Sequence, residues 1–256
     1  MNSGAVRYIA LSAIAVITTH ASAGPGSIYL SGDSSVLYAI LPGGFGVFPN
    51  DNDTFFSNVL GSGDNVRLLA GSLPAPGSDL VNTFYNSLSG VNSSTLNAAD
   101  PLDAPAIDDV DLLFVALPSR SFDAQEISLL LSYLAGGGDL FFVAEHGAFD
   151  FQANARINET LGALGSDLRV LSTFDDAGAL AATTANGQIL DRPVTDGVDT
   201  FVYGGQAISA VSGGKTLFLQ TDGRTPFLST QQIPSPATTV LIATTLAIAP
   251  RRRRHR

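Results

Sequence analysis

The chain has 256 residues, which suits one medium-sized domain, and it is acidic and contains no cysteine. Between Gly24 and Pro250, seven basic residues stand against 23 acidic ones, a net charge of −16 that would repel nucleic acid. The lack of cysteine excludes disulfides, thiolate metal sites and a cysteine nucleophile. An acidic body suits an exported protein, and halophily or binding of divalent cations would also account for it.

Residues 1–23 have the layout of a signal peptide. Arg7 precedes an apolar stretch of about ten residues that begins at Tyr8, and Ala21 and Ala23 have the spacing of an Ala-x-Ala cleavage site. A buried helix is the alternative, but such a helix would not need small residues at that spacing. We expect export and cleavage by signal peptidase, with a mature chain that begins near Gly24.

Residues 24–231 are expected to form one α/β domain, because short apolar runs that suit strands alternate with segments that suit helices. The predicted strands cover residues 27–30, 66–70, 111–117, 140–144, 168–172, 200–203, 207–211 and 216–220. Helices are predicted around residues 55–60, 80–88, 123–134 and 155–164. Residues 92–105 are rich in Ser, Asn, Asp and Pro, and are predicted to form an irregular loop.

Residues 111–144 give the clearest pattern. The apolar runs 111–117 and 140–144 are typical of strands buried in a parallel sheet. Between them apolar residues recur at helical spacing, and three glycines at 136–138 end the helix. This is a βαβ unit. The predicted fold class is therefore α/β, a single doubly wound and mostly parallel sheet with helices on both faces and a mixed or antiparallel C-terminal edge.

Polar residues follow two of the predicted strands, at the sheet edge where open α/β sheets bind ligands. They are Ser119 and Ser121 after the strand 111–117, and Glu145, His146, Asp150 and Asn154 after the strand 140–144. Asp33 is another carboxylate placed directly after a predicted strand.

A serine, a histidine base and an acidic partner form the generic arrangement of an activated nucleophile. The catalytic candidates are Glu145, His146, Ser119 and Asp150, although the chain lacks a G-x-S-x-G motif. The same edge could instead bind a ligand through Ser121, Glu145, His146 and Asn154, and Ser121 could also serve as a helix N-cap.

No metal or cofactor is predicted. The Asp and Asn residues at 50–54 could bind calcium, but the EF-hand glycine and glutamate are not in register, and capping of the next helix explains them more simply. His146 is the only histidine between residues 24 and 250, which excludes a multi-histidine metal site.

The run GGGDLFFVAEHGAF, followed by Asn154-Ala-Arg-Ile-Asn158, resembles the class I glutamine amidotransferase-like superfamily of flavodoxin-like domains, over roughly residues 27–228. In catalytic members a cysteine follows a central strand and pairs with a histidine. Here Glu145, His146 and Gly147 follow such a strand, and the chain has no cysteine. The resemblance therefore implies a non-catalytic version of the fold that binds something at the same edge.

Residues 232–256 resemble a PEP-CTERM sorting signal, which an exosortase recognises in certain Gram-negative bacteria. The motif is Pro234-Ser235-Pro236, and it is followed by an apolar stretch at 237–249 and by Arg251, Arg252, Arg253 and Arg254. Ser235 stands where the motif has glutamate, and the thirteen apolar residues are fewer than the roughly 17–25 that span a bilayer. Local thinning of the bilayer and snorkelling arginines relieve such a mismatch. The alternative is an amphipathic tail with incidental arginines.

The expected protein is exported, anchored in the inner membrane by its tail in transit, and then located at the cell surface or outside the cell. The resemblance implies an exosortase-type enzyme as partner and a biofilm or exopolysaccharide setting, with extracellular polysaccharide as a further partner. The α/β domain is expected to bind or to serve a structural role. The alternative is a hydrolase that acts on a carbohydrate or an ester at Glu145 and His146.

Overall fold

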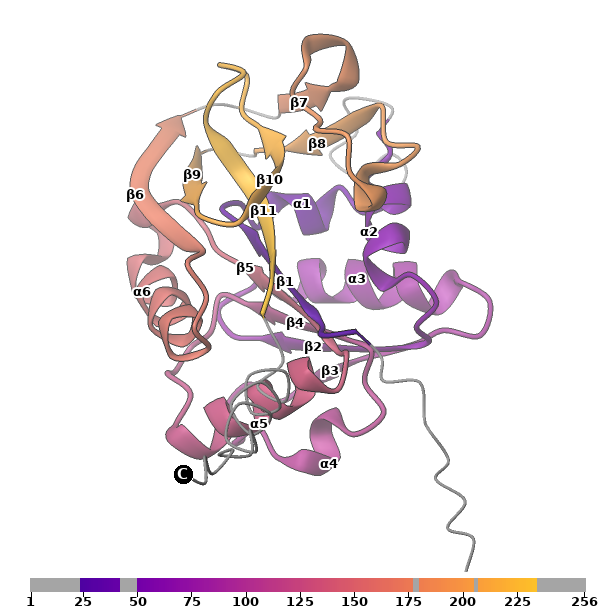
Figure 1. Ribbon diagram of the computed structural model, residues 1–256, viewed down its shortest axis with the longest axis vertical. Coiled ribbons are helices and arrows are strands. Elements are labelled where there is room, and N and C mark those ends of the chain that lie inside the picture. The colour runs from indigo at the N-terminus through magenta and orange to yellow at the C-terminus, as the bar shows by residue number, and fades with distance from the viewer. Residues whose placement is uncertain (1–23, 42–49, 177–179, 205–206, 234–256) are drawn as a thin grey trace, which may run out of the picture.

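The computed structural model describes residues 24–41, 50–176, 180–204 and 207–233 (Figure 1). The expected signal peptide, with Ala21 and Ala23, lies outside these residues, and so does the sorting tail from Pro234 onward. Within the described ranges, no helix combines the length and apolar character needed to cross a membrane.

The centre of the fold is a seven-stranded sheet in the order β10–β11–β1–β5–β4–β2–β3. Five neighbouring strands are parallel: β1 (Ser27–Ser31), β5 (Asp139–Val143), β4 (Leu112–Ala116), β2 (Asn65–Ala70) and β3 (Asn92–Leu96). The edge beside β1 is antiparallel and consists of β11 (Pro226–Gln232) and β10 (Lys215–Leu219). The mostly parallel sheet with an antiparallel C-terminal edge confirms the predicted fold class.

Helices cover both faces of this sheet, as a doubly wound fold requires (Figure 1). One face packs against α1 (Ser35–Tyr38), α2 (Asn52–Leu60) and α3 (Ala75–Ser87). The other packs against α4 (Ala104–Ile107), α5 (Ala124–Ala135) and α6 (Gly147–Ala163). Strand side chains alternate between the two layers: Phe114 and Phe141 belong to the first core, and Val115 and Phe142 to the second.

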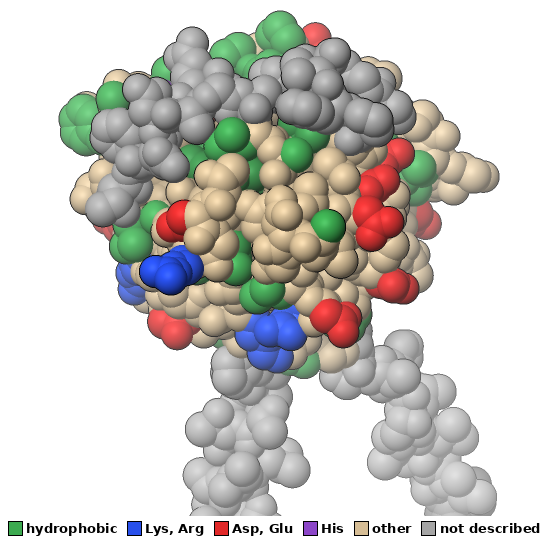
Figure 2. Space-filling view, turned by 90° about the horizontal axis from the view of Figure 1, so that it is seen from above, with side chains coloured by type: hydrophobic (Ala, Val, Ile, Leu, Met, Phe, Trp, Pro, Cys, Tyr) green, Lys and Arg blue, Asp and Glu red, His purple; other side chains and the backbone are tan. Residues whose placement is uncertain are grey.

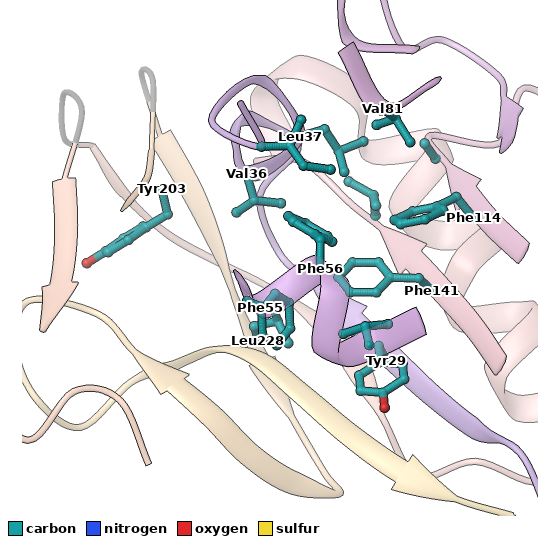
Figure 3. Close-up of a cluster of buried hydrophobic side chains, with 14 of the residues drawn as sticks. Tyr29, Val36, Leu37, Phe55, Phe56, Val81, Phe114, Phe141, Tyr203 and Leu228 are labelled. Atoms are coloured by element: carbon teal, nitrogen blue, oxygen red, sulfur yellow. The ribbon is translucent and has the colours of Figure 1, made fainter. Parts of the chain in front are cut away.

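Aromatic side chains join the parallel strands to the C-terminal part of the chain (Figure 3). Phe55 on α2 makes edge contacts with Phe56 and Phe201, both with ring centroids 5.2 Å away, and Phe56 lies 5.5 Å from Phe141. Phe201 in turn stacks on Phe218 at 4.2 Å. The aromatic side chains of the first core are therefore continuous from β4 and β5 through α2 to β8 and β10.

Two antiparallel ribbons complete the fold and lie at the top of the molecule in Figure 1. They are β6 (Arg169–Asp176) with β9 (Ala207–Ser212), and β7 (Leu180–Thr183) with β8 (Thr200–Tyr203). Between β7 and β8 lie the short helices η1 (Thr184–Asn186) and η2 (Pro193–Thr195). Figure 2 looks down on this side, where acidic side chains are scattered over the surface.

Residues 92–105, predicted as an irregular loop, contain β3 and the start of α4 instead. β3 is the edge strand of the sheet, and the side chain of Asn86 pairs with both the N–H and the carbonyl of Ser93. Polar residues suit such an edge because it faces solvent and must not pair with another chain. Apolar patterning therefore could not reveal this strand.

Two helices begin earlier than predicted. α3 starts at Ala75 rather than Leu80, with Pro76 in its first turn, where a missing N–H costs nothing. α6 starts at Gly147 rather than Ala155, and its backbone is non-helical at Asp150 (φ −146°, ψ 74°). That interruption hides the first turn from a search for helical periodicity.

The polar cluster at residues 50–54 caps the first turn of α2 as predicted, although not through its N-cap residue: Asn50 Oδ1 accepts the N–H of Asn52 at 3.2 Å and Asp53 Oδ1 accepts the N–H of Thr54 at 2.7 Å. Asp51 is the N-cap residue but makes no side-chain cap bond. Its Oδ2 instead accepts the N–H groups of Asp199 and Thr200, both at 2.9 Å. Asn52 exchanges hydrogen bonds with the backbone of Val202. The cluster therefore fastens β8 to the start of α2.

Candidate functional site

Two acidic residues lie side by side at the carboxyl edge of the sheet. β1 and β5 are parallel neighbours with Ser31 opposite Val143, so the turns that follow them meet. These turns carry Asp33, which is fully buried, and Glu145, which is 7% exposed. Buried carboxylates are rare unless they are paired or hydrogen-bonded, so the partners of this pair decide what it can do.

Both carboxylates accept hydrogen bonds from the protein itself. The N–H of Ser35 donates to Asp33 Oδ1 at 2.9 Å, and the N–H of Gly204 donates to Oδ2 at 2.5 Å. The hydroxyl of Ser34 donates to Glu145 Oε2 at 2.5 Å, and the N–H of His146 donates to Oε1 at 2.9 Å. All four carboxylate oxygens are thus engaged by donors from within the domain.

Burial first, and then the nearby Glu145 carboxylate, raise the pKa of Asp33 to about 7, against the lowering effect of the hydrogen bonds from Gly204 and Ser35. Burial also raises the pKa of Glu145, against the lowering effect of the hydrogen bonds from Ser34 and His146. The pKa of Tyr38 is raised by its own burial and by Glu145. Since the two acids interact, they titrate as a pair that retains a proton close to neutral pH.

The backbone at Glu145 is fixed from two further elements. Asn154 on α6 donates from Nδ2 to the carbonyl of Glu145 at 2.5 Å, and its Oδ1 accepts the N–H of Glu145 at 3.1 Å. From β9, Ser209 donates its hydroxyl to the same carbonyl at 3.0 Å and its N–H to the carbonyl of Gly32 at 2.9 Å. The turns after β1 and β5 are therefore held by both α6 and β9.

Close approach of β9 requires glycine at position 32. A Cβ atom on Gly32 would lie 2.0 Å from the carbonyl oxygen of Ser209, far inside contact distance. The carboxyl edge between β1 and β5 is therefore closed by the chain's own backbone, where open α/β sheets commonly admit a ligand.

His146 is the N-cap residue of α6 and is partly exposed near two exposed aromatic side chains. Its ring lies 6.0 Å from that of Phe149, which is 56% exposed, and Phe151 is 67% exposed. Asp150 uses its Oδ1 to accept the N–H of Ala153 at 2.9 Å. Asp150, a catalytic candidate from the sequence, therefore caps the second part of α6.

The serines after β4 lie in a different setting. Ser119 is exposed in a loop that crosses Gly71. Ser121 donates its hydroxyl to Oε2 of Glu159 at 2.9 Å on the exposed side of α6. The predicted N-cap role of Ser121 is wrong, because Asp123 caps α5 and forms a capping box with Glu126.

The structure thus brings together part of the predicted set. Glu145 and Asn154 are in contact, and His146 shares the turn, whereas Ser121 bonds Glu159 and Asp150 bonds within α6. Asp33 and Ser34 follow β1 directly, so the same strand-end rule applies to them. Ser209 and Gly204 gave no sequence signal, since their positions depend on how β8 and β9 fold back.

No group of three or more His, Asp or Glu side chains that could hold a metal occurs within the described part of the chain. At residues 50–54, where calcium was an alternative, the Asp51 Oδ2 atom is taken by two backbone N–H groups.

No family model and no curated protein matches the chain. Among solved structures, the chain is similar to one titled mmIFT52 N-terminal domain, with a TM-score of 0.40 and 18% sequence identity. The similarity covers 51% of this chain and 64% of that one, so it spans less than two thirds of that structure.

Proposed function

We propose that the chain is an exported protein of the cell surface or extracellular matrix, whose α/β domain binds or supports other molecules without catalysing a reaction. The Asp33–Glu145 pair carries this proposal. A general acid or base must exchange a proton with a substrate at hydrogen-bond distance. These carboxylates are buried, and their oxygens are already bonded to Ser34, Ser35, His146 and Gly204.

The export part of the proposal rests on the sequence. A signal-peptide layout precedes the acidic body, and the stretch with Pro234, Ser235 and Pro236 and the arginine block follow it. Arginines next to an apolar segment stay on the cytoplasmic side, which would leave the body outside. The proposed partners are signal peptidase, an exosortase-type enzyme, the inner membrane in transit, and extracellular polysaccharide.

The export proposal is tested by deleting residues 251–256 and fractionating the cells. The truncated protein should lose membrane retention and processing, while substitution of the exposed Arg224 by Ala should change neither. A wild-type distribution of the truncated protein would contradict the proposed tail function.

The second candidate function is a hydrolase acting on an ester or a carbohydrate. The observation in its favour is the raised pKa of Glu145 beside a partly exposed His146, since perturbed acids gather at active sites. To separate the two functions, turnover of nitrophenyl esters and glycosides is measured for the wild type, Glu145→Gln and His146→Ala. Glutamine keeps an acceptor for Ser34, so the fold should persist by circular dichroism. Turnover by the wild type that both variants lose would overturn the non-catalytic proposal.

A further inference from the structure

A groove of about 620 Å³ lies near the start of β1, away from the Asp33–Glu145 pair. Its walls come from β1, β10 and β11, from the turn before β6, and from residues 192–194 at η2. Sites for small molecules measure roughly 300–1,000 Å³. The groove is therefore large enough for a small organic ligand, and its walls could contact that ligand from several directions.

Two exposed cationic side chains, Arg192 and Lys215, line the groove. Within the described ranges the one ion pair joins Arg120 to Glu126, so neither cation is neutralised by a carboxylate. Arg192 donates from Nη1 to the carbonyl of Asp191 at 2.8 Å, which leaves its charge uncompensated. Among the described residues of the lining, Asp167 is the one that is acidic. This surplus of positive charge is notable on a body with 23 acidic and seven basic residues.

Polar groups of the lining are held in place by the fold. Oε1 of Gln231 accepts two hydrogen bonds, from the hydroxyl of Ser166 at 2.7 Å and from the N–H of Asp167 at 3.1 Å. These two bonds fix the side-chain amide of Gln231. Thr230 donates its hydroxyl to the carbonyl of Ile28 at 3.0 Å, so its oxygen is also fixed. Groups that are ordered before binding lose less entropy when a ligand arrives.

Tyr29 gives the groove an apolar base with a phenol at its end. Its ring stacks on Phe141 with centroids 5.7 Å apart, and Figure 3 shows the hydroxyl pointing away from that aromatic cluster. Burial and the nearby Asp139 carboxylate raise the pKa of Tyr29 to about 12, so the phenol stays protonated. Its side chain also shares a hydrogen bond with Ser27, another residue of the lining.

The lining thus combines unpaired cations, ordered amide and hydroxyl groups, and an aromatic base. Cations without a carboxylate partner favour an anion. The amide and hydroxyl groups suit a ligand that carries several hydroxyls of its own. Nucleic acid would be repelled by the surrounding acidic surface, so a small anion fits better than a polyanionic strand.

From this geometry we propose that the groove binds a hexose-sized, polyhydroxylated organic anion, with its carboxylate or phosphate at Arg192 and Lys215. This proposal is independent of the function proposed for the whole chain, since it uses neither the carboxyl edge nor the tail.

Calorimetric titration of the full chain with glucose, glucuronate and glucose 6-phosphate tests the proposal. The three probes share a hexose body and differ in charge, so a difference between them reports the contribution of the anionic group. We expect both anions to bind at least about tenfold more tightly than glucose, because one charge-assisted hydrogen bond raises affinity by about tenfold or more. The better of the two anions shows whether carboxylate or phosphate is preferred.

The double variant Arg192→Ala, Lys215→Ala should weaken binding of the preferred anion at least about tenfold. Its fold should persist, because the backbone N–H of Arg192 still donates to Thr195 and Lys215 is exposed. Arg224→Ala is the matched control, an exposed cation at the far turn of the β10–β11 hairpin. Anion binding no tighter than that of glucose, or an equal loss in the Arg224 variant, would overturn the proposal.

Discussion

The two ends of β1 offer a contrast within one strand. At its carboxyl end, Asp33 is buried and each of its side-chain oxygens has a donor from the same domain. At its amino end, a groove holds the exposed cations Arg192 and Lys215, which form no ion pair with a carboxylate in the part of the chain that the structure describes. Polar residues at a strand end therefore do not by themselves indicate a binding site. What distinguishes the two ends is whether the chain satisfies those groups itself.

The largest expected effect is on closure of the carboxyl edge. Gly32→Ala places a Cβ atom 2.0 Å from the carbonyl of Ser209, so β9 must move away and uncover the acid pair. We expect a loss of about 3 kcal/mol or more in the free energy of unfolding, measured by urea denaturation. Gly147→Ala is the control, because nothing lies within 4 Å of its Cβ position. Equal stability of the two variants would show that β9 does not need this close approach.

A smaller loss is expected when the support from α6 is removed. Asn154→Ala removes the side-chain acceptor of the Glu145 N–H. It also removes one of the two side-chain donors to the Glu145 carbonyl, and Ser209 remains as the other. The cost of an unsatisfied buried group predicts a loss of about 2 kcal/mol by urea denaturation. Gln152→Ala on the same helix removes an exposed amide whose Oε1 accepts a hydrogen bond from Arg156, and should cost less than about 0.5 kcal/mol. A similar cost for both variants would contradict a special role for Asn154.

The dependence of stability on pH gives the finest test. Asp33 has a pKa of about 7 in the folded state, above its ordinary value, so the folded protein binds more protons than the unfolded chain. Stability is therefore greatest below about pH 4 for this group and falls as the pH rises through 7, by about 1.4 kcal/mol per unit for each proton. Asp139 has a pKa of about 6 in the folded state and therefore makes stability fall with rising pH in the same way. The other titratable side chains beside Glu145 are those of Tyr38 and His146.

Glu145→Gln removes one carboxylate of the pair, together with its effect on Asp33. Between pH 6 and 8 its unfolding free energy should fall less steeply than that of the wild type. Asp139→Asn is the comparison variant. It removes a carboxylate at the amino end of β5, where Oδ1 of Asp139 accepts the N–H of Ser27. Parallel curves for the wild type and Glu145→Gln would show that the acids do not interact.

The sequence allowed the central layers of the fold to be predicted because burial on both faces leaves continuous apolar runs. β4 and β5 are examples, and each lies within one residue of its predicted start and end. The polar edge strand β3 left no such pattern. The strand-end rule located Glu145 and Asn154, but the bonds from Ser209 and Gly204 depend on distant segments folding back. The groove also escaped prediction, since Lys215 and Arg192 lie 23 positions apart on elements with no shared motif.

The pairing of β1 with β11 has a mechanical consequence. Ser27 lies opposite Gln232, so the chain enters and leaves the domain at the same point of the sheet. Tension between these two points would open the antiparallel ladder one hydrogen bond at a time, like a zipper, rather than load all the bonds together. Both residues also line the groove, so a ligand seated there would touch the first pair to part and would raise the force at which the domain begins to open.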